Sequence, residues 1–223
     1  MESSFKEIFI EDLPKYSDWP HRIIGLSDWK LSSGKRTNKH IKKEYGQKWE
    51  KIHHLIDENT NKTLAPFLHY AFRNHFPSNL LIHINEKFFY VRTSKTFWDY
   101  IYKTISQYIE PYIAENKTIA ELGAGWVRNL FRFFLDGIVD RIVGAEFTQE
   151  GVTAGRKIAE KFNVPGAFYH FDYNNPNKKL LPELKNSVVF THNSIEQIPR
   201  LKSVFFEFLI KAKPAVIIHF EPV

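Results

Sequence analysis

The sequence contains no cysteine among its 223 residues. The missing thiols exclude a disulfide, a zinc–thiolate site, an iron–sulfur cluster and a cysteine nucleophile. Long apolar runs are also absent, since stretches such as residues 215–218 are far too short to span a bilayer. The first residues include acids and have no apolar centre, so they do not read as an export signal. We therefore expect a cytoplasmic protein without a membrane span.

What is present is ordinary for a globular chain, with 43% hydrophobic and 25% charged residues. The aromatic share of 16% suits either a large aromatic core or an aromatic-lined pocket. Residues 21–51 hold nine lysines and arginines against three acids, which equals the whole net charge of +6. This basic segment is able to meet phosphates of a nucleic acid, a nucleotide sugar or a membrane surface. The simpler interpretation is the solvated face of a helix.

The chain has two unlike parts. Apolar residues in 49–56 and 97–109 recur at three- and four-residue steps, which predicts two helices, and Pro111 follows the second. Residues 87–93 predict a short strand between them. We expect residues 1–113 to form a mainly helical cap that supplies substrate specificity, and residues 114–223 to form a second domain.

From Thr118 onward, short apolar segments alternate with helical stretches, about 25 residues apart. This alternation predicts an α/β fold with a doubly wound, mostly parallel Rossmann-like sheet. In such sheets the ligand lies at the carboxyl ends of the strands, where the strand order reverses. The predicted strands are Thr118–Leu122, Arg141–Ala145, Ala167–Phe171, Ser187–Thr191 and Ala215–Phe220. The predicted helices are Val127–Leu135, Gly151–Phe162, a short turn at Leu180–Leu184, and Lys202–Ile210.

A glycine turn follows the first of these strands, in the order Glu121, Leu122, Gly123, Ala124, Gly125. Two glycines around one small residue allow a tight turn and a close approach of the backbone to a ligand. A dinucleotide fingerprint requires a third glycine at position 128, where this chain has Arg128. Glu121 suits a cationic or hydroxyl-bearing ligand better than a pyrophosphate. The turn therefore argues against a nicotinamide cofactor.

Acidic residues also end the second and third predicted strands. Glu146, followed by Phe147, is the expected partner of a ribose diol, because one carboxylate accepts both hydroxyl hydrogens. Asp172, followed by Tyr173, suits the exocyclic amine of an adenine that stacks on an aromatic ring. Taken singly, Glu146 also fits a surface salt bridge and Asp172 a helix cap.

The combination of Glu121-x-Gly123-x-Gly125, Glu146 and Asp172 resembles the class I, Rossmann-like S-adenosylmethionine-dependent methyltransferases. The resemblance covers residues 117–223 and implies a sheet of strand order 3-2-1-4-5. It implies S-adenosyl-L-methionine as the cofactor, with Glu121 and residues 123–125 against its methionine part. It further implies Glu146 on the ribose, Asp172 on the adenine amine, and Phe147 and Tyr173 flanking the adenine.

The segment after the fourth strand, residues 191–199, lines the floor between cofactor and substrate in that family, so the resemblance places Asn193 at the cofactor. His192 is the candidate general base, because imidazole titrates near neutral pH. Glu196 is the reserve base or the group that orients His192. The alternative is a structural role, in which His192 is hydrogen-bonded to the backbone. The other histidines show no metal-ligand grouping, so no metal is expected.

The reaction is narrowed by elimination. The Asn/Asp-Pro-Pro-aromatic motif of relatives that methylate amino nitrogens is absent, and cysteine-based methylation of pyrimidine carbon is impossible. Oxygen methylation of a small hydroxyl or carboxyl acceptor, including sugar-like and phosphorylated ones, is the leading expectation. The alternatives are an RNA or DNA methyltransferase that uses the basic segment, and a non-catalytic Rossmann-like nucleotide-binding protein. Members of that family continue through strands six and seven, whereas the given sequence stops after its fifth predicted strand. We therefore expect either a sheet that closes differently or a part of a longer protein, and the open sheet edge invites a homo-oligomer.

Overall fold

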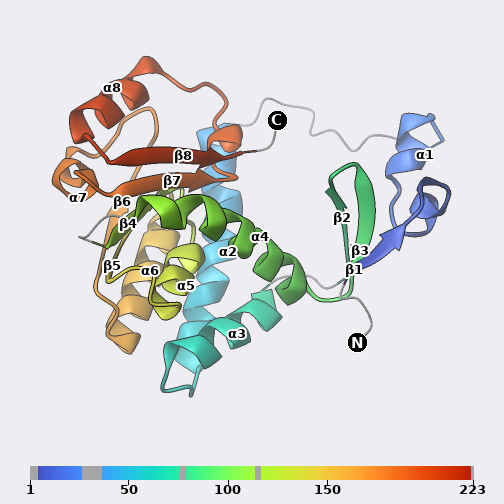
Figure 1. The fold of residues 1–223 in the computed structure, drawn as a ribbon, viewed down its shortest axis with the longest axis horizontal. Helices are drawn as coiled ribbons and strands as arrows, with labels where there is room; N and C mark the ends of the chain where they lie inside the picture. The colour runs from blue at the N-terminus through green and yellow to red at the C-terminus, as the bar shows by residue number, and fades with distance from the viewer. Residues whose placement is uncertain (1–4, 27–36, 76–78, 114–116, 222–223) are drawn as a thin grey trace. The chain divides into compact units, whose positions relative to one another are not determined.

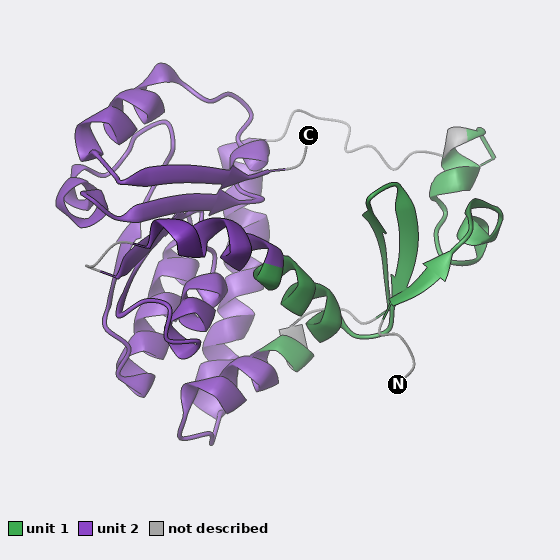
Figure 2. Cartoon of the chain, in the orientation of Figure 1, with its two compact units in different colours: residues 1–35, 72–103 green, residues 36–71, 104–223 purple. Residues whose placement is uncertain are grey.

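The computed structural model describes residues 5–26, 37–75, 79–113 and 117–221. The chain forms two compact units, which Figure 2 colours separately. Unit 1 holds residues 1–35 and 72–103, and unit 2 holds residues 36–71 and 104–223. These units do not coincide with the division predicted after residue 113, because residues 36–71 group with the C-terminal half. A separate substrate role for residues 1–113 stays a prediction.

Unit 1 is built on a three-stranded antiparallel sheet of order β1-β3-β2. The prediction of a mainly helical region is therefore incomplete, although the strand expected at residues 87–93 is confirmed as β3. Strands β2 and β3 form a hairpin whose two turn residues, Asn85 and Glu86, have φ values of 47° and 65°. The elements are β1 (Phe5–Ile8), η1 (Ile10–Lys15), α1 (Trp19–Ile23), β2 (Leu80–Ile84) and β3 (Lys87–Val91).

This part of the chain includes three longer helices, α2 (Asn38–Glu58), α3 (Leu64–His75) and α4 (Ser94–Ile109). Helices α2 and α4 contain the two that were predicted from the sequence, and α3 was not predicted. Ile52 and Ile56 are buried on α2, as one apolar helix face requires. Helix α4 ends at Ile109, and the 3₁₀ turn η2 (Glu110–Tyr112) takes up Pro111. Of the basic segment, residues 27–36 lie outside the described residues.

Unit 2 contains a five-stranded parallel sheet of order β6-β5-β4-β7-β8 (Figure 1). Numbered from β4, this is the predicted order 3-2-1-4-5. Each predicted strand is found within one residue at either end, because hydrophobic β-branched runs between turn residues are a strong strand signal. The strands are β4 (Thr118–Leu122), β5 (Arg141–Glu146), β6 (Gly166–His170), β7 (Val188–His192) and β8 (Val216–Phe220).

Helices cover both faces of this sheet, which is the doubly wound arrangement. The helical elements are α5 (Arg128–Leu135), α6 (Gln149–Phe162), η3 (Lys178–Leu180), α7 (Leu181–Leu184), η4 (Ile195–Gln197) and α8 (Ser203–Ala212). On one face, Phe205 and Leu209 of α8 pack in a core with β-strand residues such as Leu122. On the other face, Phe133 of α5 packs edge-on against Phe190 of β7, with 6.0 Å between the ring centroids.

Val127 stands between the glycine turn and α5 with a φ of 69°, a left-handed conformation that β-branched residues rarely adopt. Its side chain is fully buried against α6 and β5. A methyl group on Gly155 would lie 2.6 Å from Cγ2 of Val127, and one on Gly144 would lie 3.1 Å from the same atom. The two glycines thus make room for the valine that starts α5.

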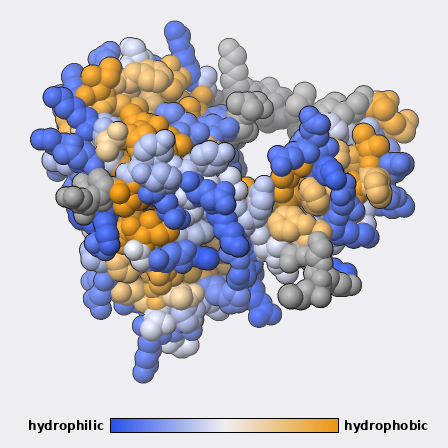
Figure 3. All heavy atoms as spheres, in the orientation of Figure 1, coloured by the Kyte–Doolittle hydropathy of each residue, from blue (hydrophilic) through white to orange (hydrophobic). Residues whose placement is uncertain are grey.

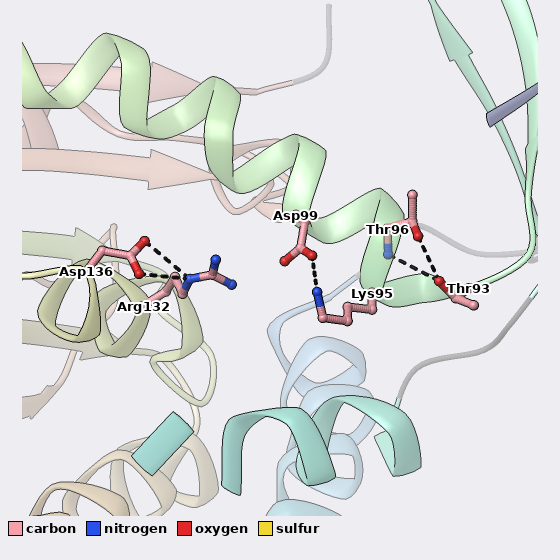
Figure 4. A network of polar contacts seen from close by, with 6 residues as sticks. All are labelled: Thr93, Lys95, Thr96, Asp99, Arg132 and Asp136. Carbon is pink, nitrogen blue, oxygen red and sulfur yellow. Dashed lines mark hydrogen bonds and ion pairs between the residues drawn. The ribbon is translucent and has the colours of Figure 1, made fainter. Parts of the chain in front are cut away.

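Several charged side chains are accounted for by pairs within single helices (Figure 4). Lys95 pairs with Asp99 on α4, and Arg132 Nε lies 3.3 Å from Asp136 Oδ2 on α5. Thr93 Oγ1 accepts from the Thr96 amide at 3.3 Å and so caps the first turn of α4. Exposed pairs of this kind contribute only about 0.3–0.5 kcal/mol each. They mark helix surfaces rather than a site.

The surface of the molecule mixes apolar and polar side chains (Figure 3). In unit 1, exposed apolar side chains gather in residues 9–26, with Ile10 and Leu26 each more than two-thirds exposed. In unit 2, Phe206 and Ile210 are exposed on the outer side of α8. Within the described ranges, none of the helices combines the length and apolar character that crossing a membrane requires.

Candidate functional site

The glycine turn after β4 directs its amides into the protein. The N–H groups of Gly123 and Ala124 both donate to the carbonyl of Ala145 at the end of β5, at 2.7 and 3.0 Å. The Gly125 N–H donates to Glu146 Oε2 at 3.0 Å. A turn that binds phosphate presents such amides to the ligand. Because these three amides are used internally, the turn is not a phosphate cradle.

The two glycines make room for side chains of the chain itself. Gly123 has a φ of 76°, and a methyl group there would lie 2.3 Å from the Cβ atom of Ser194. A methyl group on Gly125 would lie 2.8 Å from Cζ2 of Trp49, which comes from α2. The two glycines thus allow Ser194 and Trp49 to approach the backbone closely, and the close approach of a ligand stays a prediction.

Glu121 lies beneath the turn with only 2% of its surface exposed. Its Oε1 accepts from Asn129 Nδ2 at 2.7 Å, and Asn129 Oδ1 accepts from Arg128 Nη2 at 2.6 Å. The second oxygen, Oε2, is buried and has no hydrogen-bond donor among the described residues. Burial raises the pKa of Glu121 to about 8, and the Glu146 carboxyl adds to the rise, while Asn129 and Arg128 oppose it. Glu121 is therefore a buried carboxyl whose Oε2 atom has no described hydrogen-bond donor.

Glu146 is the second buried carboxyl beside the turn, at 6% exposure. Besides the Gly125 amide, it accepts from the backbone N–H of Thr148 at 2.9 Å and from the Thr148 hydroxyl at 2.8 Å, both at Oε1. Thr148 in turn caps α6 by accepting from the Gly151 amide at 3.3 Å. Burial raises the pKa of Glu146, and these hydrogen bonds oppose that rise. In this arrangement Glu146 ties the glycine turn to the start of α6, and a ribose would share its Oε2 with Gly125.

Two of the residues expected around an adenine, Phe147 and Asp172, lie just beyond the ends of strands. Phe147 is half-buried, with the ring of His170 6.1 Å away and Lys42 Nζ of α2 5.0 Å from its centroid. Asp172 is half-buried, and its Oδ1 accepts from the Asn174 amide at 2.8 Å. Both side chains therefore lie at the ends of β5 and β6, as the pattern predicted.

Tyr173 does not offer its ring to a ligand. The side chain is 3% exposed, and its ring packs edge-on against Phe171 and Phe205, at centroid distances of 5.1 Å for each. The hydroxyl donates to the Leu122 carbonyl at 2.9 Å and lies 2.7 Å from Ser194 Oγ. The predicted stacking of Tyr173 on adenine is thus at odds with its place in the core. Its hydroxyl and Ser194 instead fill the point between β4 and β7 where the strand order reverses.

His192, the candidate general base, is the last residue of β7. Burial, together with the charge of the nearby Arg128 guanidinium, lowers the pKa of its imidazole to about 4. The ring is therefore neutral at physiological pH. Asn193 follows it in the left-handed region with a φ of 49°, and its Nδ2 lies 3.3 Å from His192 Nε2. Glu196 is exposed, and its carboxylate accepts from the neighbouring Gln197 side chain.

Glu221, just after β8, organises the segment after β7. Its carboxylate accepts from the Ser194 amide at 2.9 Å and from the Glu196 amide at 3.3 Å. His219 Nδ1 lies 2.9 Å from Thr191 Oγ1, so this imidazole also has a structural partner. Within the described part of the chain, no three histidine, aspartate or glutamate side chains gather as a metal site.

Sequence reasoning missed four side chains that build this site: Trp49, Asn129, Thr148 and Ser194. Thr148 carries a readable signal, because a threonine directly before a helical stretch is a preferred N-cap. Trp49 was recognised as part of a helix face and as an aromatic side chain for a sugar-like or phosphorylated acceptor, but not as a neighbour of the glycine turn. Nothing local to Asn129 or Ser194 indicates their partners, which are Glu121 and the Leu122 carbonyl.

Known proteins match this chain in structure and not in sequence. No protein-family model matches the sequence, and no curated protein matches it. Among solved structures, a crystal structure of the cyclase SpnF aligns over 80% of this chain at 10% identity and a TM-score of 0.49. A point mutant of MtNAS aligns over 88% at 11% identity and a TM-score of 0.44. The alignments span 57% and 62% of those two chains, respectively.

Both TM-scores are below 0.5 at identities of 10–11%, so these two likenesses carry no argument about the cofactor or the reaction of this chain. The strand order of unit 2, numbered from β4, is the order 3-2-1-4-5 that the resemblance in the motifs implies.

Proposed function

We propose that this chain binds S-adenosylmethionine at the glycine turn and transfers its methyl group to an oxygen of a small-molecule acceptor. The sulfonium group of this cofactor supplies an activated methyl, so the chain needs only to bind, orient and exclude water. The proposal assigns the turn and Glu121 to the amino-acid part of the cofactor. Phe147 and Asp172 are assigned to the adenine.

The observation that carries the proposal is the charge environment of the turn. Two buried carboxyls, Glu121 and Glu146, flank it, and Oε2 of Glu121 has no described donor. The amides of the turn donate to Ala145 and Glu146 and not outward. Such a site disfavours a pyrophosphate and favours a ligand with positive charge and hydroxyl groups. This supports S-adenosylmethionine over a nicotinamide cofactor or a nucleoside phosphate.

The neutral imidazole of His192 bears on the acceptor. A group whose pKa has fallen to about 4 is a weak base toward an ordinary hydroxyl. A carboxylate acceptor needs no deprotonation before it is methylated. Of the two oxygen acceptors expected from the sequence, a hydroxyl and a carboxyl, we therefore propose the carboxylate. In this proposal His192 does not remove a proton from the acceptor; it orients the acceptor carboxylate through a water or a protonated group between them.

Calorimetric titration of the full chain tests the cofactor. We expect micromolar binding of S-adenosylmethionine and S-adenosylhomocysteine and no binding of NADH. The matched control is Glu160→Gln, an exposed acid on α6, which should leave the affinity unchanged. Binding of NADH in place of the two sulfur ligands would contradict the proposal, as would no binding to a folded chain.

Glu121 gives the proposed site a pH dependence. Below a pKa of about 8 its carboxyl is mostly protonated, and a cationic ligand favours the ionised form. Binding therefore releases a proton, and the affinity for S-adenosylmethionine should rise between pH 6 and 8, by at most about tenfold per pH unit. Glu121→Gln should flatten this dependence. Calorimetric titrations at pH 6, 7 and 8, in two buffers of different ionisation enthalpy, measure how many protons are released when the ligand binds.

The raised pKa of Glu121 also predicts how the stability of the fold depends on pH, whether or not a ligand binds. Because the folded-state pKa of Glu121 is raised, the stability linked to this group is fully present below its unfolded pKa and is lost as the pH rises toward about 8. Glu121→Gln should therefore unfold at a higher temperature relative to the wild type at pH 8.5 than at pH 5. An equal difference at both pH values would mean that Glu121 is ionised throughout.

A further inference from the structure

The indole of Trp49 lies directly on the glycine turn. A methyl group on Gly125 would lie 2.8 Å from Cζ2 and 3.2 Å from Cη2 of this ring. The side chain is only half-buried as a whole. Tyr45, one helical turn earlier on α2, has its ring 5.8 Å away and tilted by 31°. The indole therefore borders the turn, and the Tyr45 ring lies beside the indole.

Helix α2 is fixed in this position by α6 of the same unit. His53 Nε2 lies 2.8 Å from the Glu150 carbonyl. Lys161 Nζ donates to the carbonyls of Ile56 at 2.7 Å and Asn59 at 3.0 Å. These bonds join the middle and the end of α2 to the two ends of α6. The indole is thus held on the turn by polar contacts that do not involve the indole itself.

The groups around the turn match one chemical class. Glu121 and Glu146 are buried beside it; burial is the main cause that raises the pKa of Glu121, and Glu146 adds a smaller rise. The indole of Trp49 adds an electron-rich face, which is the best aromatic partner of a cation. A sulfonium has no N–H or O–H to donate, so an aromatic face and nearby carboxyls are the interactions open to it.

We infer that Trp49 is a specificity-determining residue of the proposed cofactor site, where its indole favours a positively charged sulfonium over the neutral thioether. This inference rests on the proposed function and names the group that distinguishes substrate from product. The neutral S-adenosylhomocysteine loses the cation–π contact and leaves more readily. The contribution corresponds to roughly a 3- to 30-fold preference for the charged ligand.

The test compares three ligands on the full chain: S-adenosylmethionine, neutral S-adenosylhomocysteine, and sinefungin, which carries an ammonium in place of the sulfonium. The wild type should bind both cations more tightly than the thioether. Trp49→Leu should bring the three affinities together mainly by weakening the cations, and Trp49→Phe should keep part of the preference. Tyr112→Leu, at an aromatic residue 54% exposed in unit 2, is the control.

The possible outcomes are distinct. Equal weakening of all three ligands by Trp49→Leu, in a chain with a native circular dichroism spectrum, would show that the indole only packs on the turn. Tighter binding of all three would show that it obstructs the site. Either result overturns the inference and leaves the proposed function standing. No binding of any ligand to the folded wild type would instead overturn the proposed function.

Discussion

Gly123→Ala is expected to destabilise the chain by about 2–5 kcal/mol. The backbone at this position has a φ of 76°, which costs alanine about 1–2 kcal/mol. The added methyl would also lie 2.3 Å from the Cβ atom of Ser194 and 3.0 Å from the Tyr173 hydroxyl. Because those two side chains are bonded to the Leu122 carbonyl, neither moves without losing a buried hydrogen bond. Urea unfolding followed by tryptophan fluorescence measures the loss.

Two companion variants separate strain from collision. Gly137 has a φ of 70°, yet no described atom lies within 4 Å of a methyl placed there, so Gly137→Ala carries the conformational cost alone. Ser194→Gly removes the atoms nearest to the new methyl. Its combination with Gly123→Ala should be less destabilised than the sum of the two single variants. Equal losses for Gly123→Ala and Gly137→Ala, with no coupling to Ser194, would contradict the proposed collision.

Glu146→Ala is expected to cost about 3–5 kcal/mol and to abolish cofactor binding. The substitution leaves three donors without their acceptor, namely the Gly125 amide and the amide and hydroxyl of Thr148. Each such buried donor costs about 1–3 kcal/mol, offset in part by the removal of a buried charge. The loss corresponds to a fall in melting temperature on the order of 10 °C.

The melting temperature and the affinity for S-adenosylhomocysteine are measured on the same preparations. Affinity is read well below the melting transition, so that a weakened chain is still folded. Glu146→Gln keeps the volume and one acceptor, and should lie between Glu146→Ala and the wild type. Glu160→Gln should stay within about 0.5 kcal/mol of the wild type. An unchanged melting temperature in Glu146→Ala would mean that Gly125 and Thr148 readily find other partners.

The parallel sheet was predictable because its signals are local. Each strand is a buried apolar run, and each is followed by turn residues and a helix. The small sheet of unit 1 was only partly predictable. Strand β1 carries Lys6 and Glu7, buries only Ile8, and pairs with a strand more than 80 residues away. Long-range pairing of short, half-exposed strands leaves little trace in a local pattern.

The candidate site divides in the same way. The acids at the strand ends were predictable, because the carboxyl ends of parallel strands share one edge of the sheet. The partners of those acids were not. The bond that Glu146 accepts from the Gly125 amide depends on the path of the backbone through the turn, which a local sequence pattern does not specify. Whether Tyr173 turns toward the crevice or the core depends on Phe171 and Phe205.

The side chains at positions 127, 144 and 155 share one space, so the size of each limits the size of the other two. The left-handed backbone of Val127 directs a branched side chain toward Gly144 on β5 and Gly155 on α6, where even a methyl would meet it. Among homologous sequences, an alanine at 144 or 155 should therefore occur together with glycine, alanine or asparagine at 127. Positions 127, 144 and 155, which span 29 residues of the sequence, would then evolve as a correlated set. Correlated substitution at these positions would trace this packing among homologues even where overall identity is low.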